Sequence, residues 1–449
     1  MHKILENCNE ILWPNLIVYK NIQTDQAFRV LKELITEMSQ HDISLETASK
    51  YHELLGMLVK EAEDRGEIAT GNLWKDHLLN LILLDENPFS LRCESSGLRG
   101  VGSALKALVK QDLARLHRLY AFDFDALIGL LKDKFPQLDI AAFPTNYDLI
   151  KYKNGRDPEF YFIEGHRIKK QLDCSPDWSE NIADLATFYY NVGCGKFGKY
   201  WGFILDETSD GIKLEGVSDL DPVRLSDLIG YESQKKEILE NIRRFVKGFP
   251  ANNMLLYGDR GTGKSSTIKA LIHEFGKEGL RLVEVPKYQL IYLRQIIIQL
   301  KRRPQRFIIF IDDLSFEEHE TEYKYLKAML EGSLEAPPKN VLICATSNRR
   351  HLIREFHSDM DDEIKSRDTI EEKLSLSDRF GITVIFPSPN QEEYLNIVEG
   401  IAKNRGIDLE PDKLRELALR WELWNNQRSG RTARQFVDDL AGKIAASRA

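Results

Sequence analysis

The sequence of 449 residues is poor in the features that mark secreted, metal-stabilised or membrane-spanning proteins. Its five cysteines are scattered, without a CxxC pair or a histidine cluster, which argues against a disulfide framework and a zinc site. The longest apolar runs, such as LLNLILL, are too short to cross a bilayer. The first residues, MHKILENCNEILWPNL, are interrupted by Glu6, Glu10 and Pro14, so they do not resemble a secretory signal. We therefore expect a cytoplasmic protein with no membrane partner.

The chain also lacks an excess of positive charge. It has 62 Lys and Arg residues against 70 Asp and Glu residues, which gives a formal net charge of −8. This balance argues against a strongly basic nucleic-acid surface, although it does not exclude a local basic patch. The hydrophobic fraction of 42% and the charged fraction of 29% are ordinary for a globular protein.

The chain changes character along its length in a way that predicts four parts. Residues 1–140 carry apolar side chains at three- and four-residue spacing and should be mainly helical. Residues 141–221 should form a small mixed α/β region. Strand and helix patterns alternate in residues 222–388, which predicts a parallel sheet covered on both faces. Residues 389–449 should again be helical.

The hydrophobic periods also place the individual strands. In the mixed region, residues 159–170 and 199–217 should contain short strands, and residues 181–193 should form a helix. Five strands are expected in the parallel sheet, at residues 253–258, 280–286, 306–311, 340–346 and 383–386.

The segment GDRGTGKSS, residues 258–266, carries the strongest chemical signal. It fits the phosphate-binding pattern G-x-x-x-x-G-K-[ST] and lies between an expected strand and an expected helix. Its glycines allow backbone N–H groups to surround phosphates. Lys264 should contact the β- and γ-phosphates, and the Ser265 hydroxyl should ligate Mg²⁺. The residues expected to bind ATP here are Gly258, Asp259, Arg260, Gly261, Thr262, Gly263, Lys264, Ser265 and Ser266.

Two further strand ends carry polar side chains suited to the same chemistry. FIIFIDDLSF, residues 307–316, ends an apolar strand with Asp312, the expected Mg²⁺ partner, and Asp313, the expected base beside the attacking water. Without a phosphate loop upstream, two acids at a solvated strand end would be ordinary. Asn348 follows the strand at 340–346 and should position the γ-phosphate and the water. A polar turn is the alternative interpretation of that strand end.

Together these motifs resemble the AAA+ ATPases over residues 222–449. The resemblance implies a P-loop NTPase core with a C-terminal helical lid, and it places Asn348 at the sensor-1 position. LSLSDRFG is similar to the segment that carries an arginine finger, which makes Arg379 the candidate. RSGRTARQF resembles the sensor-2 motif, with Arg431 as first choice and Arg434 as second. The segment DLIGYESQKKEIL is similar to the lining of the adenine pocket, with Leu228, Ile229, Gly230 and Tyr231 as its candidate contacts.

A narrower resemblance and two departures refine this interpretation. FIIFIDDLSFEE, ATSNRRHLI, SLSDRFG and SGRTARQF together resemble a prokaryotic AAA+ family catalogued as a domain of unknown function, in which a distinctive N-terminal region precedes the ATPase. PKYQLIYL lacks the aromatic-apolar-glycine pore loop of protein unfoldases. Tyr288 is a candidate for that role, but we expect it to pack in a helix interface instead. Asp313 is one methylene shorter than the glutamate usual in the class. It could hold the water through a different geometry or with help from Glu317 or Glu318.

The sequence therefore predicts an AAA+ ATPase that binds ATP and Mg²⁺ and couples hydrolysis to work on a protein client held by the N-terminal region. An Arg379 finger acting on a neighbour's ATP requires a homo-oligomer. One alternative is a binding switch that hydrolyses ATP slowly or not at all. A second is a DNA-remodelling or loader ATPase, for which the basic segment RQIIIQLKRRPQR, residues 294–306, is the candidate surface. Salt-dependent DNA binding lost on replacing Arg302 and Arg303 with alanine would favour that alternative.

Overall fold

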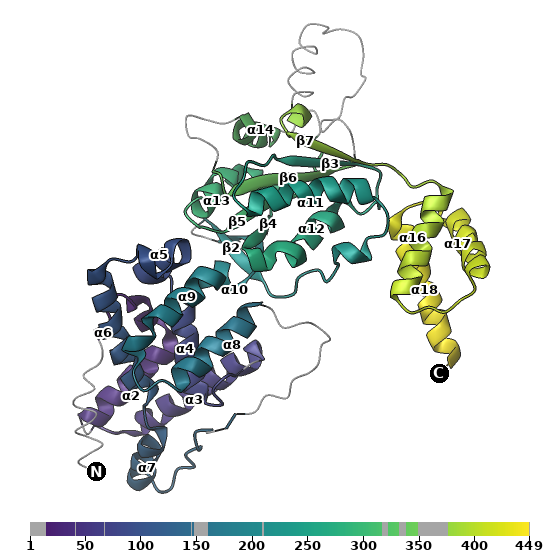
Figure 1. Cartoon of the computed structure of the whole chain (residues 1–449). Helices are drawn as coiled ribbons and strands as arrows, with labels where there is room; N and C mark the ends of the chain where they lie inside the picture. The colour runs from purple at the N-terminus through teal and green to yellow at the C-terminus, as the bar shows by residue number, and fades with distance from the viewer. Residues whose placement is uncertain are drawn as a thin grey trace, which may run out of the picture. The chain divides into compact units, whose positions relative to one another are not determined.

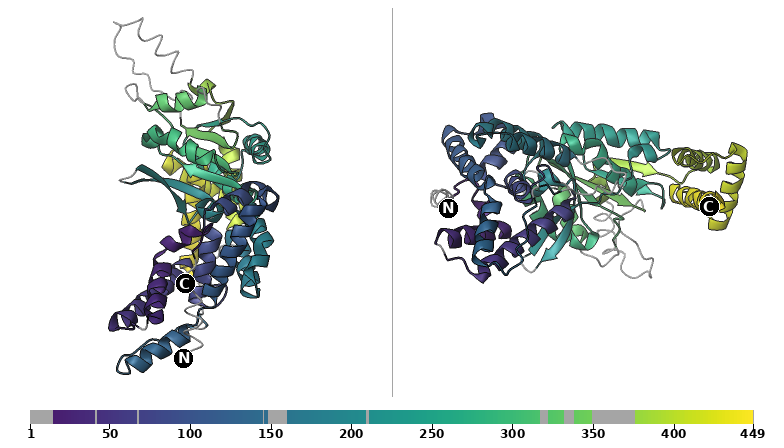
Figure 2. Two further views of the ribbon diagram at one scale, coloured as in Figure 1. Left: turned by 90° about the vertical axis from the view of Figure 1, so that its left-hand side faces the viewer. Right: turned by 90° about the horizontal axis from the view of Figure 1, so that it is seen from below.

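The computed structural model describes two compact units, residues 1–199 and 200–449, each of which is considered by itself (Figures 1 and 2). The described residues are 15–40, 42–66, 68–144, 146–147, 160–208, 211–316, 322–331, 338–348 and 376–448. Residues of the expected mixed region 141–221 fall in both units. Among the described helices, none combines the length and the apolar character that a membrane span requires.

The described secondary-structure elements of the first unit are all helical. Its helices are α2 (Gln26–Ser39), α3 (Leu45–Arg65), α4 (Leu73–Leu84), α5 (Pro88–Ser96), α6 (Ser103–Tyr120), α7 (Phe124–Lys134), α8 (Phe160–Asp173), α9 (Ile182–Val192) and α10 (Gly195–Lys199), with short 3-10 turns η1 (Lys20–Thr24), η2 (Leu98–Gly100) and η3 (Trp178–Asn181). The strand expected within 159–170 is wrong, because residues 160–170 belong to α8. Tyr161, Ile168 and Leu172 are buried at a spacing that lies on one helix face.

Buried charged side chains join the helices of the first unit. Asp112, on α6, accepts the backbone N–H groups of residues 17–19 at 2.7 to 3.1 Å, which anchors the segment before η1. His77, on α4, lies between the carboxylates of Asp25 and Glu61. Burial opposes a charge on this imidazole, but its hydrogen bonds to the two carboxylates outweigh that effect and raise the pKa of His77 to about 9.

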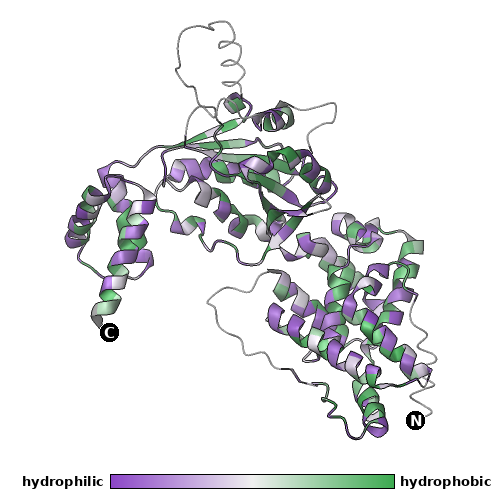
Figure 3. Cartoon of the chain, turned by 180° about the vertical axis from the view of Figure 1, so that it is seen from behind, coloured by the Kyte–Doolittle hydropathy of each residue, from purple (hydrophilic) through white to green (hydrophobic). Residues whose placement is uncertain are grey.

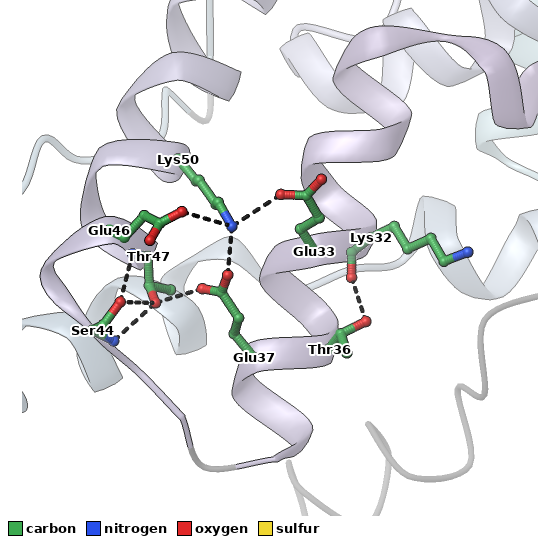
Figure 4. A network of polar contacts seen from close by, with 8 residues as sticks. All are labelled: Lys32, Glu33, Thr36, Glu37, Ser44, Glu46, Thr47 and Lys50. Carbon is green, nitrogen blue, oxygen red and sulfur yellow. Dashed lines mark hydrogen bonds and ion pairs between the residues drawn. The ribbon is translucent and has the colours of Figure 1, made fainter.

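A charge cluster connects α2 to α3 on the surface of the same unit (Figure 4). The Lys50 ammonium lies 2.9 Å from Glu33, 2.6 Å from Glu37 and 3.4 Å from Glu46. Thr47, in the first turn of α3, donates its hydroxyl to Glu37 at 2.6 Å. One lysine therefore holds carboxylates from both helices, and the start of α3 is fixed against the end of α2.

The second unit is built on a mostly parallel sheet of seven strands in the order β2-β1-β4-β5-β6-β3-β7. The strands are β1 (Gly202–Thr208), β2 (Gly211–Val217), β3 (Met254–Gly258), β4 (Leu280–Glu284), β5 (Arg306–Ile311), β6 (Val341–Ser347) and β7 (Ile382–Phe386). The five parallel strands expected from the sequence are confirmed. The sheet has two more because the hairpin β1–β2 joins its edge, with β1 parallel to β4 and antiparallel to β2.

Helices cover the sheet and form a separate lid. They are α11 (Glu232–Val246), α12 (Lys264–Phe275), α13 (Leu293–Leu300) and α14 (Tyr323–Glu331) in the core, α16 (Gln391–Asn404), α17 (Pro411–Asn425) and α18 (Gly430–Arg448) in the lid, and the 3-10 turns η4 (Leu225–Asp227), η5 (Gly276–Glu278) and η6 (Lys287–Tyr292). Helices α11 and α12 pack on one sheet face, where Leu256, Phe310 and Cys344 are buried against them. The strands are mostly apolar (Figure 3), as expected for strands covered on both faces.

The lid has its own small core, formed by the apolar faces of α16, α17 and α18. The interface packing expected of Tyr288 is wrong, because 69% of this side chain is exposed on η6. The carboxyl ends of β3, β5 and β6 lie side by side at one edge of the sheet. That edge is where open α/β sheets place their ligands.

Candidate nucleotide-binding site

The phosphate-loop segment connects β3 to α12 through glycines in the left-handed region. Gly261 and Gly263 have φ angles of 77° and 91°. Gly258 has a φ of 147°, and a Cβ atom there would lie 1.9 Å from the carbonyl oxygen of Phe386. Helix α12 begins at Lys264, directly after this turn, so its N-terminal N–H groups point toward the space that the loop encloses.

Lys264 lies inside the loop with its ammonium group directed back at the backbone. It donates to the carbonyl oxygens of Gly258 at 2.8 Å and Asp259 at 2.7 Å, and to the side-chain oxygen of Asn348 at 3.1 Å. Burial lowers the pKa of Lys264, while the nearby carboxylates of Asp259, Asp313 and Asp312 act in the opposite direction. The lysine is thus a buried cation held among neutral oxygens.

The first acid after β5 connects this strand to β6 and to the start of α12. The Asp312 carboxylate accepts the hydroxyl of Ser265 at 2.5 Å and the hydroxyl of Thr346, on β6, also at 2.5 Å. Carboxylate and hydroxyl oxygens are ligands that Mg²⁺ accepts beside nucleotide phosphates. The neighbouring side chains therefore fit a magnesium ion bound together with a nucleotide.

The second acid lies in a less common backbone conformation. Asp313 has a φ angle of 48°, in the left-handed region. Its backbone N–H donates to Asp312 Oδ1 at 3.1 Å and to Thr346 Oγ1 at 3.0 Å. Its carboxylate accepts the Asn348 amide at 2.6 Å. The neighbouring strand therefore fixes both the backbone and the side chain of Asp313.

The segment before α11 forms an apolar wall on the other side of the loop. Tyr231 also has a left-handed φ, of 58°, and donates its hydroxyl to the carbonyl oxygen of Pro387 at 2.7 Å. Burial and the nearby carboxylate of Glu393 raise the pKa of Tyr231 to about 12. Its ring centroid lies 5.1 Å from that of Phe386.

The lid contacts the loop directly. The backbone N–H of Arg431, at the start of α18, donates to the carbonyl oxygen of Gly261 at 3.1 Å. Ser388, just before the lid, donates its hydroxyl to Asp259 at 2.6 Å and its backbone N–H to the same carboxylate at 3.2 Å. The loop is therefore hydrogen-bonded both to the segment that leads into the lid and to the start of the last lid helix.

A cleft of about 560 Å³ brings most of the expected site residues together. Its lining includes Leu228, Ile229, Gly230, Tyr231, Arg260, Gly261, Thr262, Gly263, Lys264, Ser265, Ser266, Asp312, Asp313, Asn348, Arg431 and Arg434. Gly258 and Asp259 are not in this lining, but their carbonyl oxygens accept hydrogen bonds from Lys264. Arg379 does not line the cleft; it lies exposed just before β7. Glu317 and Glu318 are outside the described residues.

Sequence reasoning missed several lining residues. Thr346 and Phe386 are strand residues whose orientation depends on the partner strand. Ile397 and Ile401 are spaced as one face of α16, a pattern that by itself indicates only a helix core. Lys235 lines the cleft from α11 and donates to the carbonyl oxygen of Leu228 at 2.7 Å. For these missed residues, the four-residue spacing of Ile397 and Ile401 was the one signal that the sequence offered.

Comparisons with known proteins place the second unit in a family. The family described as "Protein of unknown function (DUF815)" matches residues 198–444, more than half of the chain. Replication factor C large subunit of Thermofilum pendens is 40% identical over 62 residues, which are 14% of this chain and 15% of that protein. The corresponding subunit of Staphylothermus marinus is 34% identical over 58 residues, 13% of this chain and 14% of that protein. The chain thus spans only about a seventh of the length of these curated relatives.

Solved structures with a similar arrangement include the Thermotoga maritima RuvB Holliday junction branch migration motor. That structure is 17% identical, with a TM-score of 0.36, and the match covers 51% of this chain and 67% of the other. A mutant of the same motor matches over the same shares with a TM-score of 0.37 and 17% identity.

Proposed function

Since the chain belongs to the DUF815 family, we propose that it is a cytoplasmic AAA+ ATPase that binds ATP with Mg²⁺ and couples hydrolysis to conformational work on a protein client. One observation carries the proposal. Lys264 in the loop, the Ser265–Asp312 pair and the Asp313–Asn348 pair lie together in one cleft.

The loop supplies the binding energy for the phosphates. The N–H groups at the start of α12 and the helix dipole favour an anion at this place. Lys264 at present donates to two loop carbonyls and to Asn348, and a phosphate oxygen would offer it a charged acceptor instead. Such charge-assisted hydrogen bonds are roughly twice as strong as neutral ones. The adenine ring would lie against Tyr231 and the apolar residues of α16.

Ser265 and Asp312 would hold the magnesium ion. When bound, Mg²⁺ supplies positive charge that neutralises the phosphate oxygens during transfer. The Thr346 hydroxyl donates to the same Asp312 oxygen as Ser265, so it keeps the carboxylate oriented toward the loop.

Asp313 and Asn348 would act on the attacking water. The Asp313 carboxylate is the acceptor for a water proton as the water oxygen bonds to the γ-phosphorus and the bond to the leaving β–γ bridging oxygen breaks. Asn348 contacts both Asp313 and Lys264. Its amide therefore links the group that would take the proton to the group that would hold the γ-phosphate.

The lid contacts offer a route from hydrolysis to motion. Arg431 and Arg434 line the cleft, and Ser388 is bonded to the loop through Asp259. Loss of the γ-phosphate would remove the contacts that draw these arginines toward the loop, and the lid would change its angle. Arg379 lies outside the cleft of its own chain, so we propose that it completes the site of a neighbouring protomer in a homo-oligomer, while the first unit holds the client.

Titration with ATP and a phosphate-release assay test the proposal. Lys264→Ala should lose ATP binding, because it removes the ammonium group that lies inside the loop. Lys277→Ala is the matched control: it removes an exposed lysine after the far end of the same helix and should bind and hydrolyse ATP as the unmodified chain does. Equal ATP affinity in both variants would overturn the site assignment. Tight binding by the unmodified chain without phosphate release would instead indicate a binding switch.

A further inference from the structure

A basic surface lies at the end of the sheet opposite the nucleotide cleft. It is formed by three segments: the end of α11 with the turn that follows it, the turn between α13 and β5, and Lys339, shortly before β6. Its members are Arg243, Arg244, Lys247, Arg302, Arg306 and Lys339, together with the aromatic ring of Phe249. The sequence segment 294–306 contains only part of this surface, since Arg294 lies at the opposite end of α13.

Specific contacts hold the three segments of this basic surface together. The Arg306 guanidinium lies 5.7 Å from the centroid of the Phe245 ring on α11. It also donates to the carbonyl oxygen of Lys339 at 2.9 Å. The Asn340 side chain donates to the carbonyl oxygens of residues 300, 303 and 305 at 2.8 to 3.2 Å. The positive charges are thus placed by packed and hydrogen-bonded backbone, not by mobile loops.

The cations of the basic surface differ from those of the lid in their partners. Four lid arginines, at positions 405, 415, 420 and 428, each form an ion pair with a carboxylate. Within the part of the chain that the structure describes, no ion pair is formed by Arg243, Arg244, Lys247, Arg302 or Lys339. In a chain with a net charge of −8, a cluster of unpaired cations is a feature that an external anion would explain.

A groove beside these cations presents an aromatic ring. It has a volume of about 390 Å³ and is lined by Arg243, Arg244, Lys247, Phe249 and one acid, Glu240. The Phe249 side chain is 61% exposed. Its backbone N–H donates to the carbonyl oxygen of Arg244 at 2.9 Å, so the turn that carries the ring is fixed against α11.

We propose that this basic surface binds single-stranded nucleic acid. Arginine and lysine side chains would contact successive phosphates, and the Phe249 ring would stack on one base. An acidic protein segment would use the same cations but would gain little from an exposed ring between them. The surface is at the opposite end of the sheet from the ATP cleft, so this binding is independent of the proposed hydrolysis.

Fluorescence anisotropy of a labelled oligothymidylate with the full chain tests the proposal over a series of salt concentrations. The double variant Arg243→Ala/Arg244→Ala should bind more weakly. The slope of its log affinity against log salt should become shallower by about 1.4, because each of the two lost phosphate contacts contributes roughly 0.7 on single strands. Phe249→Ala should lose roughly five- to hundredfold in affinity with the salt slope unchanged.

Two controls separate this surface from general charge effects and from the ATP site. Lys403→Ala/Lys413→Ala removes the same charge from exposed positions of the lid and should bind the oligonucleotide as the unmodified chain does. All variants should keep the basal rate of ATP hydrolysis. Measuring that rate therefore shows whether a negative result concerns the nucleic-acid surface or the proposed ATPase.

Three outcomes would overturn the proposal. One is the absence of oligonucleotide binding by the unmodified chain at low salt. Another is unchanged oligonucleotide affinity in Phe249→Ala, which would indicate that the surface binds polyanions in general and does not stack on a base. The third is competition by polyglutamate as effective as competition by an unlabelled oligonucleotide, which would indicate an acidic protein partner.

Discussion

Replacing Asp313 tests why an aspartate occupies the position proposed for the catalytic base. Its φ of 48° places it in the left-handed region, which costs most non-glycine residues roughly 1–2 kcal/mol. Aspartate and asparagine enter this region more readily because their short polar side chains hydrogen-bond locally. Here the Asp313 carboxylate accepts the Asn348 amide at 2.6 Å. A glutamate would extend one methylene beyond this contact.

Two substitutions separate the backbone requirement from the chemistry. Asp313→Asn keeps the side-chain length and an oxygen for Asn348, so stability should change by less than about 0.5 kcal/mol. It removes the proton acceptor, and turnover should fall by about 10² to 10⁴ while ATP still binds. Asp313→Glu keeps a carboxylate but carries the left-handed cost of about 1 kcal/mol, which for a unit of this size corresponds to a melting temperature lower by about 2–4 °C.

Thermal unfolding, ATP titration and single-turnover phosphate release provide the readouts. Asp313→Gly is the control, because glycine adopts a positive φ freely and has no carboxylate; it should be as stable as the unmodified chain and inactive. Hydrolysis by Asp313→Asn at the unmodified rate would refute the role as base. Unchanged stability together with full activity in Asp313→Glu would refute the backbone reason for aspartate.

Three further variants test the neighbouring parts of the molecule. Arg379→Ala should hydrolyse ATP slowly and lose the rise in rate per protomer with protein concentration that a finger acting between protomers produces; a rate that is independent of concentration in the unmodified chain would contradict this. Ser388→Ala removes the hydroxyl bonded to Asp259 and should weaken ATP affinity several-fold, by about 1 kcal/mol. Equilibrium titration with ATP measures this affinity, and an unchanged value would contradict the prediction. His77 is charged in the folded protein, because its pKa is raised to about 9. Its charge therefore stabilises the folded state by on the order of 3 kcal/mol. This contribution is complete below pH about 6.5 and is lost as the pH rises through 9. Denaturant unfolding from pH 6 to 10 should show that loss in the unmodified chain and not in His77→Asn.

The parallel core of the fold could be predicted because its signals are local. Strand β5 is a continuous apolar run, and the phosphate loop between β3 and α12 has a fixed spacing of glycines and lysine. The placement of the hairpin β1–β2 could not be predicted, because pairing with β4 joins residues that are 80 positions apart and depends on which sheet edge is free. Helix α8 could not be told from a strand by its sequence because its first turns, FYFIE, are rich in aromatic residues, whose strand preference tertiary packing overrides.

The site shows the same division between local and distant information. Lys264, Ser265 and Asp312 follow from short motifs, whereas Ile397 and Ile401 reach the cleft only because the lid returns to the loop. The backbone of Asp313 is the sharpest case. In the sequence, an aspartate where the class usually has glutamate looks like a shortened base. In the structure, its N–H is held by Asp312 and Thr346 in a conformation that favours aspartate. The shorter side chain is therefore explained by the turn that carries it, and its catalytic competence is decided by turnover in Asp313→Asn, not by its length.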